Sequence, residues 1–367
     1  MPAVGDLLRK INPWNKGKCC TLTASLMIAL TMPQGAAAPP PPPPISTGTA
    51  TLLIALYALS YFVPFYLSPT TRPSPTLSRD APSVIRARVR SVTLSSLLCT
   101  AFTYVVLSRA GTAGTSEAIT PREALHLLGL WPAALWDSCR VLFLTALLFL
   151  GPLFSYFIVE RGWAEWMRLA PVKEVWDEWT TWRNIIAGPI TEEILFRTAS
   201  IPLMLLSRSP LHRTIFLTPV LFGLAHVHHF YEFRLTTPRV PASAALLRSL
   251  FQLGYTTLFG AYATFLFLRT GSLVAVCAVH AFCNCMGLPQ VWGRVEPPEF
   301  DEPVAVPVMA GGDTGGGLAN GSGRPSILWT VAYYVLLVAG AVLWWRKLWV
   351  LSESENALVP SSAFSRV

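Results

Sequence analysis

Long apolar runs recur along the chain from residue 49 onward and are separated by short polar loops. A helix of ~20 predominantly apolar residues is long enough to cross the hydrocarbon core of a bilayer. By that criterion we predict about eight spans. They lie at 49–67, 91–108, 139–159, 184–206, 214–231, 247–268, 272–289 and 326–349. The expected fold class is all-α, a polytopic transmembrane helical bundle.

Basic residues indicate how this bundle is oriented. The loop 68–90 contains a single aspartate and five arginines, which are Arg72, Arg79, Arg86, Arg88 and Arg90. Because loops rich in lysine and arginine stay on the cytosolic side, we expect this loop to face the cytosol. Counting crossings from it places three further segments on the same side, at 160–183, 232–246 and 290–325.

The segment 160–183 is predicted to lie along the membrane surface. It contains five tryptophans interleaved with charged residues, and Trp176, Trp179 and Trp182 recur at every third position. That spacing puts the three indoles on one face of a helix. Tryptophan is enriched at the membrane–water interface, so we expect an interfacial helix parallel to the headgroups.

The first 46 residues differ from the rest of the chain. Lys16 and Lys18 precede a short apolar stretch, 19–31, which is followed by a run of six prolines, 39–44. This pattern is typical of a signal peptide or a short signal anchor with an extended spacer after it. We therefore divide the chain into an N-terminal extension (1–46), a membrane-embedded domain (47–350) and a C-terminal tail (351–367).

Composition narrows the class of protein. Of the 367 residues, 52% are hydrophobic and only 13% are charged, whereas water-soluble domains carry about a quarter charged residues. Water-soluble and disordered chains are both excluded by these values. The net charge of +8 is concentrated beside apolar runs, which favours membrane lipids as partners over nucleic acid. The seven cysteines form no CxxC pair, which argues against a zinc ribbon or a disulfide framework.

Three charged residues interrupt the predicted span 184–206. Glu193 and Arg197 are four residues apart, with the glutamate on the N-terminal side, which is the favourable arrangement for an ion pair on a helix. Glu192 points about 100° away from Glu193 and has no such partner. A charge inside a membrane span is costly and is a functional hypothesis by default. We interpret the pair as structural support and Glu192 as the functional group.

Polar side chains in two other predicted spans lie at a similar depth. His226 belongs to the span 214–231, and His280 and Asn284, four residues apart, share one helical face in the span 272–289. Glu192 lies roughly 12 Å from the cytosolic start of its helix, and the other three lie in the cytosolic half of theirs. We expect these four residues to converge on one site.

The expected chemistry of that site is hydrolysis by activated water. A carboxylate beside an imidazole can take a proton from water near neutral pH. A second histidine and an asparagine amide can stabilise the oxyanion that forms when water attacks an amide carbonyl. Cys283 lies in apolar surroundings, where a thiol stays protonated and is a poor nucleophile.

The ordered motifs resemble those of a known family. They are Gly-Pro-x-x-Glu-Glu-x-x-Phe-Arg, Phe-x-x-x-His and His-x-x-x-Asn, on three successive predicted spans within about 184–290. Each motif alone is common, but the ordered set is similar to that of the type II CAAX prenyl proteases, the Ras-converting endopeptidases.

This resemblance implies an enzyme of the endoplasmic reticulum membrane with its active site facing the cytosol. Its substrates would be isoprenylated proteins that end in a CAAX sequence, from which it removes the last three residues. The resemblance also implies that Glu192 and His226 activate the water, while His280 and Asn284 hold the oxyanion. Neither a metal ion nor another cofactor is expected in this mechanism.

Two alternatives stay open at this stage. A zinc-dependent membrane protease would draw its ligands from a glutamate and from four histidines, His226, His228, His229 and His280. Against it, the chain has no HExxH motif, and we expect His228 and His229 to be solvated at the membrane edge. A transporter would use Glu192 as a proton relay, but the chain lacks the second copy of the glutamate motif that an internal repeat would supply.

Overall fold

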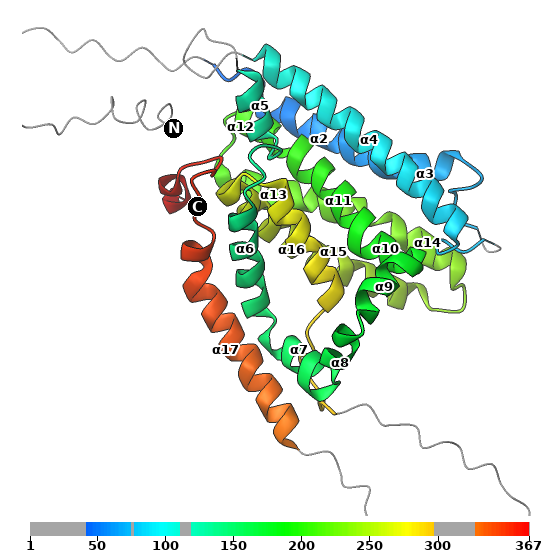
Figure 1. Ribbon diagram of the computed structural model, residues 1–367. Helices are drawn as coiled ribbons and strands as arrows, with labels where there is room; N and C mark the ends of the chain where they lie inside the picture. Colours follow the sequence, from blue (N-terminus) through cyan, green and yellow to red (C-terminus); the bar gives the residue numbers. More distant parts are fainter. Residues whose placement is uncertain (1–41, 75–76, 111–118, 297–326, 367) are drawn as a thin grey trace, which may run out of the picture. The chain divides into compact units, whose positions relative to one another are not determined.

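The computed structural model describes residues 42–74, 77–110, 119–296 and 327–366. Most of the expected N-terminal extension lies outside these residues, and so does most of the loop 290–325. All regular elements of the described residues are helices, so the predicted all-α class is confirmed (Figure 1).

Two long apolar helices, α2 (Thr47–Phe62) and α4 (Pro82–Arg109), lie side by side (Figure 1). The hydroxyl of Ser46 accepts a hydrogen bond from the Thr49 backbone and caps the start of α2. A buried hydrogen bond of 2.9 Å joins the Tyr57 hydroxyl on α2 to the Thr103 hydroxyl on α4. The short helix α3 (Pro64–Leu67) continues α2.

The C-terminal helix α17 (Ile327–Leu351) packs against α6 (Leu135–Leu148) and α7 (Leu150–Phe154). Small residues permit this contact, because a Cβ atom on Gly340 would collide with the carbonyl oxygen of Leu147. After α6 the chain bends by 82° into the pair formed by α7 and η1 (Ser155–Val159).

The central helices carry the predicted motifs. The first motif lies on one helical rod of four consecutive elements, η2 (Arg183–Ala187), α11 (Gly188–Glu193), η3 (Ile194–Ala199) and α12 (Ile201–Leu206). The second motif lies at the end of α13 (Leu211–Ala225), with His226 as the residue that follows this helix, and the third lies on α16 (Leu273–Met286). Between them come α14 (His228–Thr236) and α15 (Ala242–Thr270). Two peripheral elements complete the described fold, α5 (Pro121–Leu127) and η4 (Ser361–Arg366).

The tryptophan-rich segment is three short helices, so the expectation of one continuous helix is wrong, while its place at the membrane surface stays a prediction. These helices are α8 (Gly162–Met167), α9 (Ala170–Asp177) and α10 (Trp179–Trp182). The break falls at Glu178, whose backbone is extended with φ −106° and ψ 113°. Trp176 and Trp179 therefore belong to different helices, although both indoles remain exposed.

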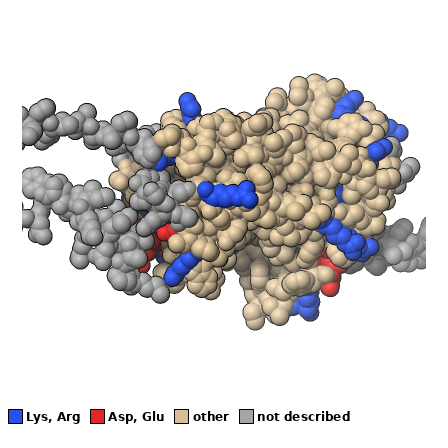
Figure 2. Space-filling model, turned by 90° about the horizontal axis from the view of Figure 1, so that it is seen from above, with Lys and Arg blue, Asp and Glu red and all other residues tan. Residues whose placement is uncertain are grey.

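Three helices are long and apolar enough to cross a membrane, at Thr47–Leu67, Pro82–Arg109 and Ile327–Leu351, and the bent pair Leu135–Val159 is a fourth candidate. They correspond to four of the eight predicted spans. The other four are helical in the structure, but the count of eight stays a prediction. Figure 2 shows a face whose visible side chains are mostly uncharged, with scattered basic groups, as expected of a membrane protein.

A hydrophobic cluster positions the first motif. Leu195 and Phe196 on η3 are buried against Ile54 on α2 and Phe222 on α13. These contacts anchor the residues that follow the two glutamates directly. The rotation of α11 about its axis is therefore set by apolar packing immediately next to the charged residues.

Candidate active site

The helical rod that carries Glu192 and Glu193 has π-type turns on both sides of α11. Pro189 lies at the start of α11 and has no N–H to donate to the preceding turn. The backbone N–H of Gly188 bonds instead to the carbonyl of Arg183, five residues earlier. Such local departures from α-helical geometry are frequent at functional sites.

Glu193, Arg197 and His280 form a buried cluster. The side chains of Glu193 and Arg197 are 0% and 1% exposed, and Nη1 of the arginine lies 3.0 Å from Oε1 of the glutamate. The predicted ion pair is therefore present. Arg197 also donates to the carbonyl of Gly260 at 3.2 Å, and Nδ1 of His280 lies 2.6 Å from the same glutamate oxygen.

Glu192 faces a different environment. Its side chain is 20% exposed and lines a cavity of about 180 Å³, here called the central cavity. His226 and Asn284 line the same cavity, so helices α11, α13 and α16 each contribute one predicted residue, His226 directly following α13. Further polar residues of the wall are Tyr61, Arg79, Arg88, Arg183, Asn184, Thr191, His228 and His229.

Hydrogen bonds orient the two polar groups opposite Glu192. Nδ1 of His226 lies 2.9 Å from the carbonyl oxygen of Phe222. Because that oxygen only accepts, Nδ1 carries a proton, and in the neutral ring Nε2 is then the proton acceptor. The Asn284 amide donates to the carbonyl of Asn184 at 2.8 Å, which leaves its second N–H for another acceptor.

His280 connects the buried cluster with the central cavity. Its Nε2 lies 3.9 Å from Oε2 of Glu192, while its Nδ1 contacts Glu193. The ring packs on Phe259 with a centroid distance of 4.5 Å. Of the four residues expected to converge, three line the cavity and His280 lies behind Glu192.

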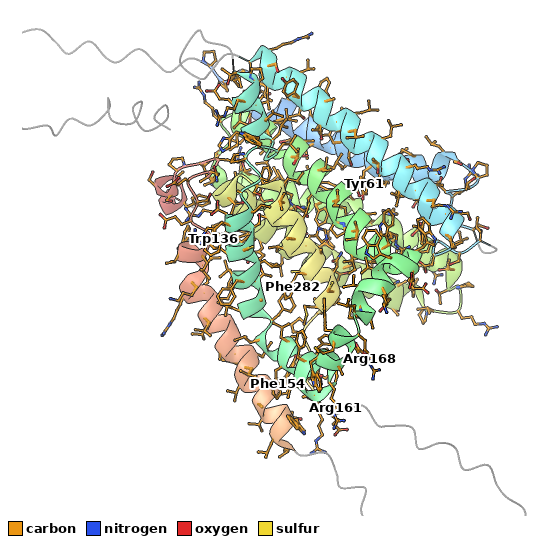
Figure 3. All side chains as sticks on the ribbon, viewed as in Figure 1. Tyr61, Trp136, Phe154, Arg161, Arg168 and Phe282 are labelled. Carbon is orange, nitrogen blue, oxygen red and sulfur yellow. The ribbon has the colours of Figure 1, made fainter. Side chains whose placement is uncertain are left out.

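Tyr61 is a residue of the cavity wall that sequence reasoning missed (Figure 3). Its hydroxyl is 3.2 Å from the Thr191 hydroxyl, directly before the two glutamates. Tyr61 lies on an apolar helix, where neither a motif nor a periodic pattern of polar residues distinguishes it from a residue that only packs.

The expected solvation of His228 and His229 is wrong. The His228 ring is stacked on Phe62 with a centroid distance of 5.5 Å and an interplanar angle of 3°. The His229 side chain is 23% exposed and bonds through Nδ1 to Glu232 at 3.1 Å. Because α13 ends at Ala225 and α14 starts three residues later, these histidines pack against neighbouring elements instead of continuing into solvent.

His228, His229 and Glu232 bring one ligand atom each to within 4.8 Å of the others, which would suit a metal ion. This set differs from the ligands expected for a zinc protease, because His226 and His280 do not belong to it. The carboxylate of Glu232 already contacts Arg88 at 2.6 Å and Arg79 at 3.2 Å. Two positive charges so close to a ligand disfavour a cation there.

The pKa of Glu232 reflects these partners. Burial by itself raises the pKa of a carboxyl group, but the hydrogen bond from His229 and the charges of Arg88 and Arg79 outweigh burial and lower it to about 2. Glu232 is therefore ionised and paired with Arg79, Arg88 and His229, which line the central cavity.

Comparisons with known proteins identify the family. Residues 174–286 match the family model described as type II CAAX prenyl endopeptidase Rce1-like. The chain is 36% identical over 247 residues to the "Probable CAAX prenyl protease 2" of Schizosaccharomyces pombe, covering 66% of this chain and 83% of that protein.

It is 34% identical over 272 residues to the "CAAX prenyl protease 2" of Arabidopsis thaliana, covering 68% of this chain and 83% of the relative. For the human "CAAX prenyl protease 2" the identity is 35% over 247 residues, covering 66% of this chain and 71% of the human protein. No solved structure matches the chain. The resemblance seen in the motifs is confirmed, and the chain belongs to the type II CAAX prenyl endopeptidase family.

Proposed function

We propose that this protein is a membrane endopeptidase that removes the C-terminal tripeptide from isoprenylated proteins ending in CAAX. Family membership and the names of the relatives support the activity and the substrate class. The observation that carries the mechanism is the shared cavity, in which the Glu192 carboxylate and the proton-accepting nitrogen of His226 meet the amide of Asn284.

In the proposed reaction, water attacks the carbonyl carbon of the prenylated cysteine. Glu192, with His226, takes one proton from the water as the oxygen bonds to carbon. The C–N bond then breaks, and this proton passes to the nitrogen of the leaving tripeptide. Asn284 stabilises the oxyanion that forms between the two steps. His280 does not line the cavity in the structure, so its Nε2 has to turn past Glu192 to join Asn284 at the oxyanion.

The geometry of His280 sets a condition on its role. Its Nδ1 lies at hydrogen-bond distance from Glu193, so a hydrogen bond from Nε2 to the oxyanion requires a proton on both ring nitrogens. The groups around the ring are the carboxylates of Glu192 and Glu193 and, beyond Glu193, the guanidinium of Arg197.

The cavity also suits a substrate attached to the membrane. Part of its wall is apolar and comes from α3, α4 and η3, through Phe65, Ile85, Val89, Val92 and Phe196. Both α2 and α4 are candidate membrane spans. A prenyl group on the substrate cysteine would anchor the peptide in the bilayer next to this wall.

Release of the tripeptide tests the proposal directly. Purified protein in lipid vesicles is incubated with a prenylated CAAX peptide, and the products are identified by mass spectrometry. We expect release of the intact tripeptide and no release from the same peptide without its prenyl group. Failure of the purified protein to cleave the prenylated peptide, with transport of a solute instead, would favour the transporter.

The proposed location is the endoplasmic reticulum membrane, with the site facing the cytosol. Asn320 is the acceptor of the chain's single N-glycosylation sequence, in a loop outside the described residues that the crossing count places in the cytosol. We expect it to remain unmodified in cells, as judged by insensitivity to an endoglycosidase. As a control, Gly114→Asn creates an acceptor in the predicted lumenal loop and is expected to be glycosylated; a glycan at Asn320 would invert the topology.

A further inference from the structure

A second cavity adjoins the central one. Its volume is about 520 Å³, and it shares three wall residues with the central cavity, Arg79, Arg183 and His229. Residues that line only the second cavity include Phe233, Thr236, Arg248, Phe251, Gln252 and Tyr255. Asp80 and Glu232 also line the second cavity, and both carboxylates are paired with arginines. A peptide that leaves the central cavity past the shared wall therefore enters a space with cationic, anionic and aromatic side chains.

Arg248 differs from the other arginines of this wall. Arg183 pairs with Asp80 at 2.7 Å, and Arg79 pairs with Glu232 at 3.2 Å. Arg248 has no carboxylate within salt-bridge distance among the residues that the structure describes. Its guanidinium lies 4.4 Å from the centroid of the Phe233 ring, which holds the charge in place while leaving its N–H donors available to an anion.

The spacing along α15 matches the length of a tripeptide. Arg248, Gln252 and Tyr255 line the cavity at positions i, i+4 and i+7 of one helical face. Arg248 and Tyr255 are then separated by ~10.5 Å along the helix axis. Three extended residues span about 10 Å, so a tripeptide whose first residue lies beside Tyr255 reaches Arg248 with its C-terminus.

We propose that the second cavity binds the departing tripeptide and that Arg248 pairs with its C-terminal carboxylate. This inference rests on the proposed endopeptidase function and names the part of the site that recognises the free chain end. The guanidinium of arginine can donate two parallel hydrogen bonds to one carboxylate, in a bidentate pair. The aromatic side chains of Phe233, Phe251 and Tyr255 provide apolar contacts for the aliphatic residues that precede the carboxylate.

The test combines one enzyme change with one substrate change. Cleavage of a prenylated CAAX peptide is compared with cleavage of the same peptide carrying a C-terminal amide, by wild type and by Arg248→Gln. We expect wild type to lose kcat/KM on the order of 10- to 100-fold with the amide, the range of a hydrogen bond to a charged group. Arg248→Gln is expected to lose a similar factor with the free acid, mainly through KM, and little more with the amide.

Two further variants separate charge from position. Arg239→Gln removes the same charge from an exposed residue that lines neither cavity, and it should keep wild-type values on both peptides. Arg248→Lys keeps the positive charge but cannot form a bidentate pair with a carboxylate. Its kcat/KM for the free-acid peptide should therefore fall between those of wild type and Arg248→Gln. Folded yield in detergent is measured for each variant.

Three outcomes would contradict the inference. An equal loss on both peptides would assign Arg248 to folding or to lipid headgroups, and wild-type kinetics of Arg248→Gln would remove it from the binding site. In both cases the endopeptidase function itself would stand. A wild-type protein that cleaves neither peptide would overturn the proposed function and this subsite with it.

Discussion

Glu192 and Glu193 are neighbours in sequence, yet they lie in two different environments. Glu193 is fully buried with Arg197 and His280, whereas Glu192 is 20% exposed and lines the central cavity. The rotation of about 100° per helical residue separates them. A carboxylate that is removed from water needs cationic partners. Glu193 is therefore held in its ion pair with Arg197, whereas Glu192 remains accessible to substrate and water.

The buried cluster is not arranged for stability alone. Among the described residues, Oε2 of Glu193 and Nε of Arg197 are buried without a hydrogen-bond partner. Each such atom costs about 1–3 kcal/mol. The cluster nevertheless holds His280 between the two glutamates, which indicates that it positions this ring beside the cavity.

The largest expected effect comes from Glu192→Ala. Loss of a general base lowers turnover by about 10²–10⁴-fold, and no ion pair of Glu192 with arginine or lysine is broken among the described residues. We expect tripeptide release to disappear while folded yield and thermal stability in detergent stay near wild type. The exposed Glu355→Ala is the matched control and should retain full activity.

Arg197→Ala should affect folding more than Glu192→Ala does. It leaves Glu193 buried without its guanidinium partner, which costs roughly 3–5 kcal/mol. Folded yield and the thermal midpoint in detergent should both fall, and activity with them. The double change Glu193→Gln with Arg197→Leu should recover part of the stability, because no unpaired charge remains. Equal effects of Arg197→Ala and Glu192→Ala on folding would erase the distinction between the two carboxylates.

Asn284→Ala tests whether a residue of the central cavity stabilises the oxyanion. Removing one such donor costs about 2.7–4 kcal/mol of transition-state stabilisation, which is a loss of roughly 10²–10³ in kcat. The KM should change little, because the interaction forms mainly in the transition state. Steady-state kinetics measure both constants. A raised KM with unchanged kcat would move Asn284 from oxyanion stabilisation to substrate binding.

Metal removal is expected to have the smallest effect. The candidate ligands His228, His229 and Glu232 are already engaged with aromatic rings and arginines, and the proposed mechanism uses no metal. Prolonged dialysis against a strong chelator should leave activity unchanged, and elemental analysis should show less than stoichiometric zinc. Loss of turnover on chelation that is restored by added zinc would replace the glutamate mechanism with a metal-dependent one.

Features that depend on local spacing could be predicted from the sequence. The Glu193–Arg197 ion pair follows from residues four apart on one helix, and the different direction of Glu192 follows from the same geometry. The all-α class follows from apolar runs of membrane length. The placement of His226 and Asn284 with Glu192 at one cavity agrees with the depth arithmetic. Their catalytic roles stay predictions.

Features that depend on contacts between distant segments were decided by the tertiary structure. His280 meets Glu193 across 87 positions of sequence, and the Tyr61 hydroxyl reaches Thr191 across 130. The packing of His228 on Phe62 and the helix break at Glu178 likewise have no local signal. By itself the sequence determined which residues share a helix face. Which faces meet depends on how whole helices pack, because that arrangement minimises exposed polar groups and voids over the entire bundle.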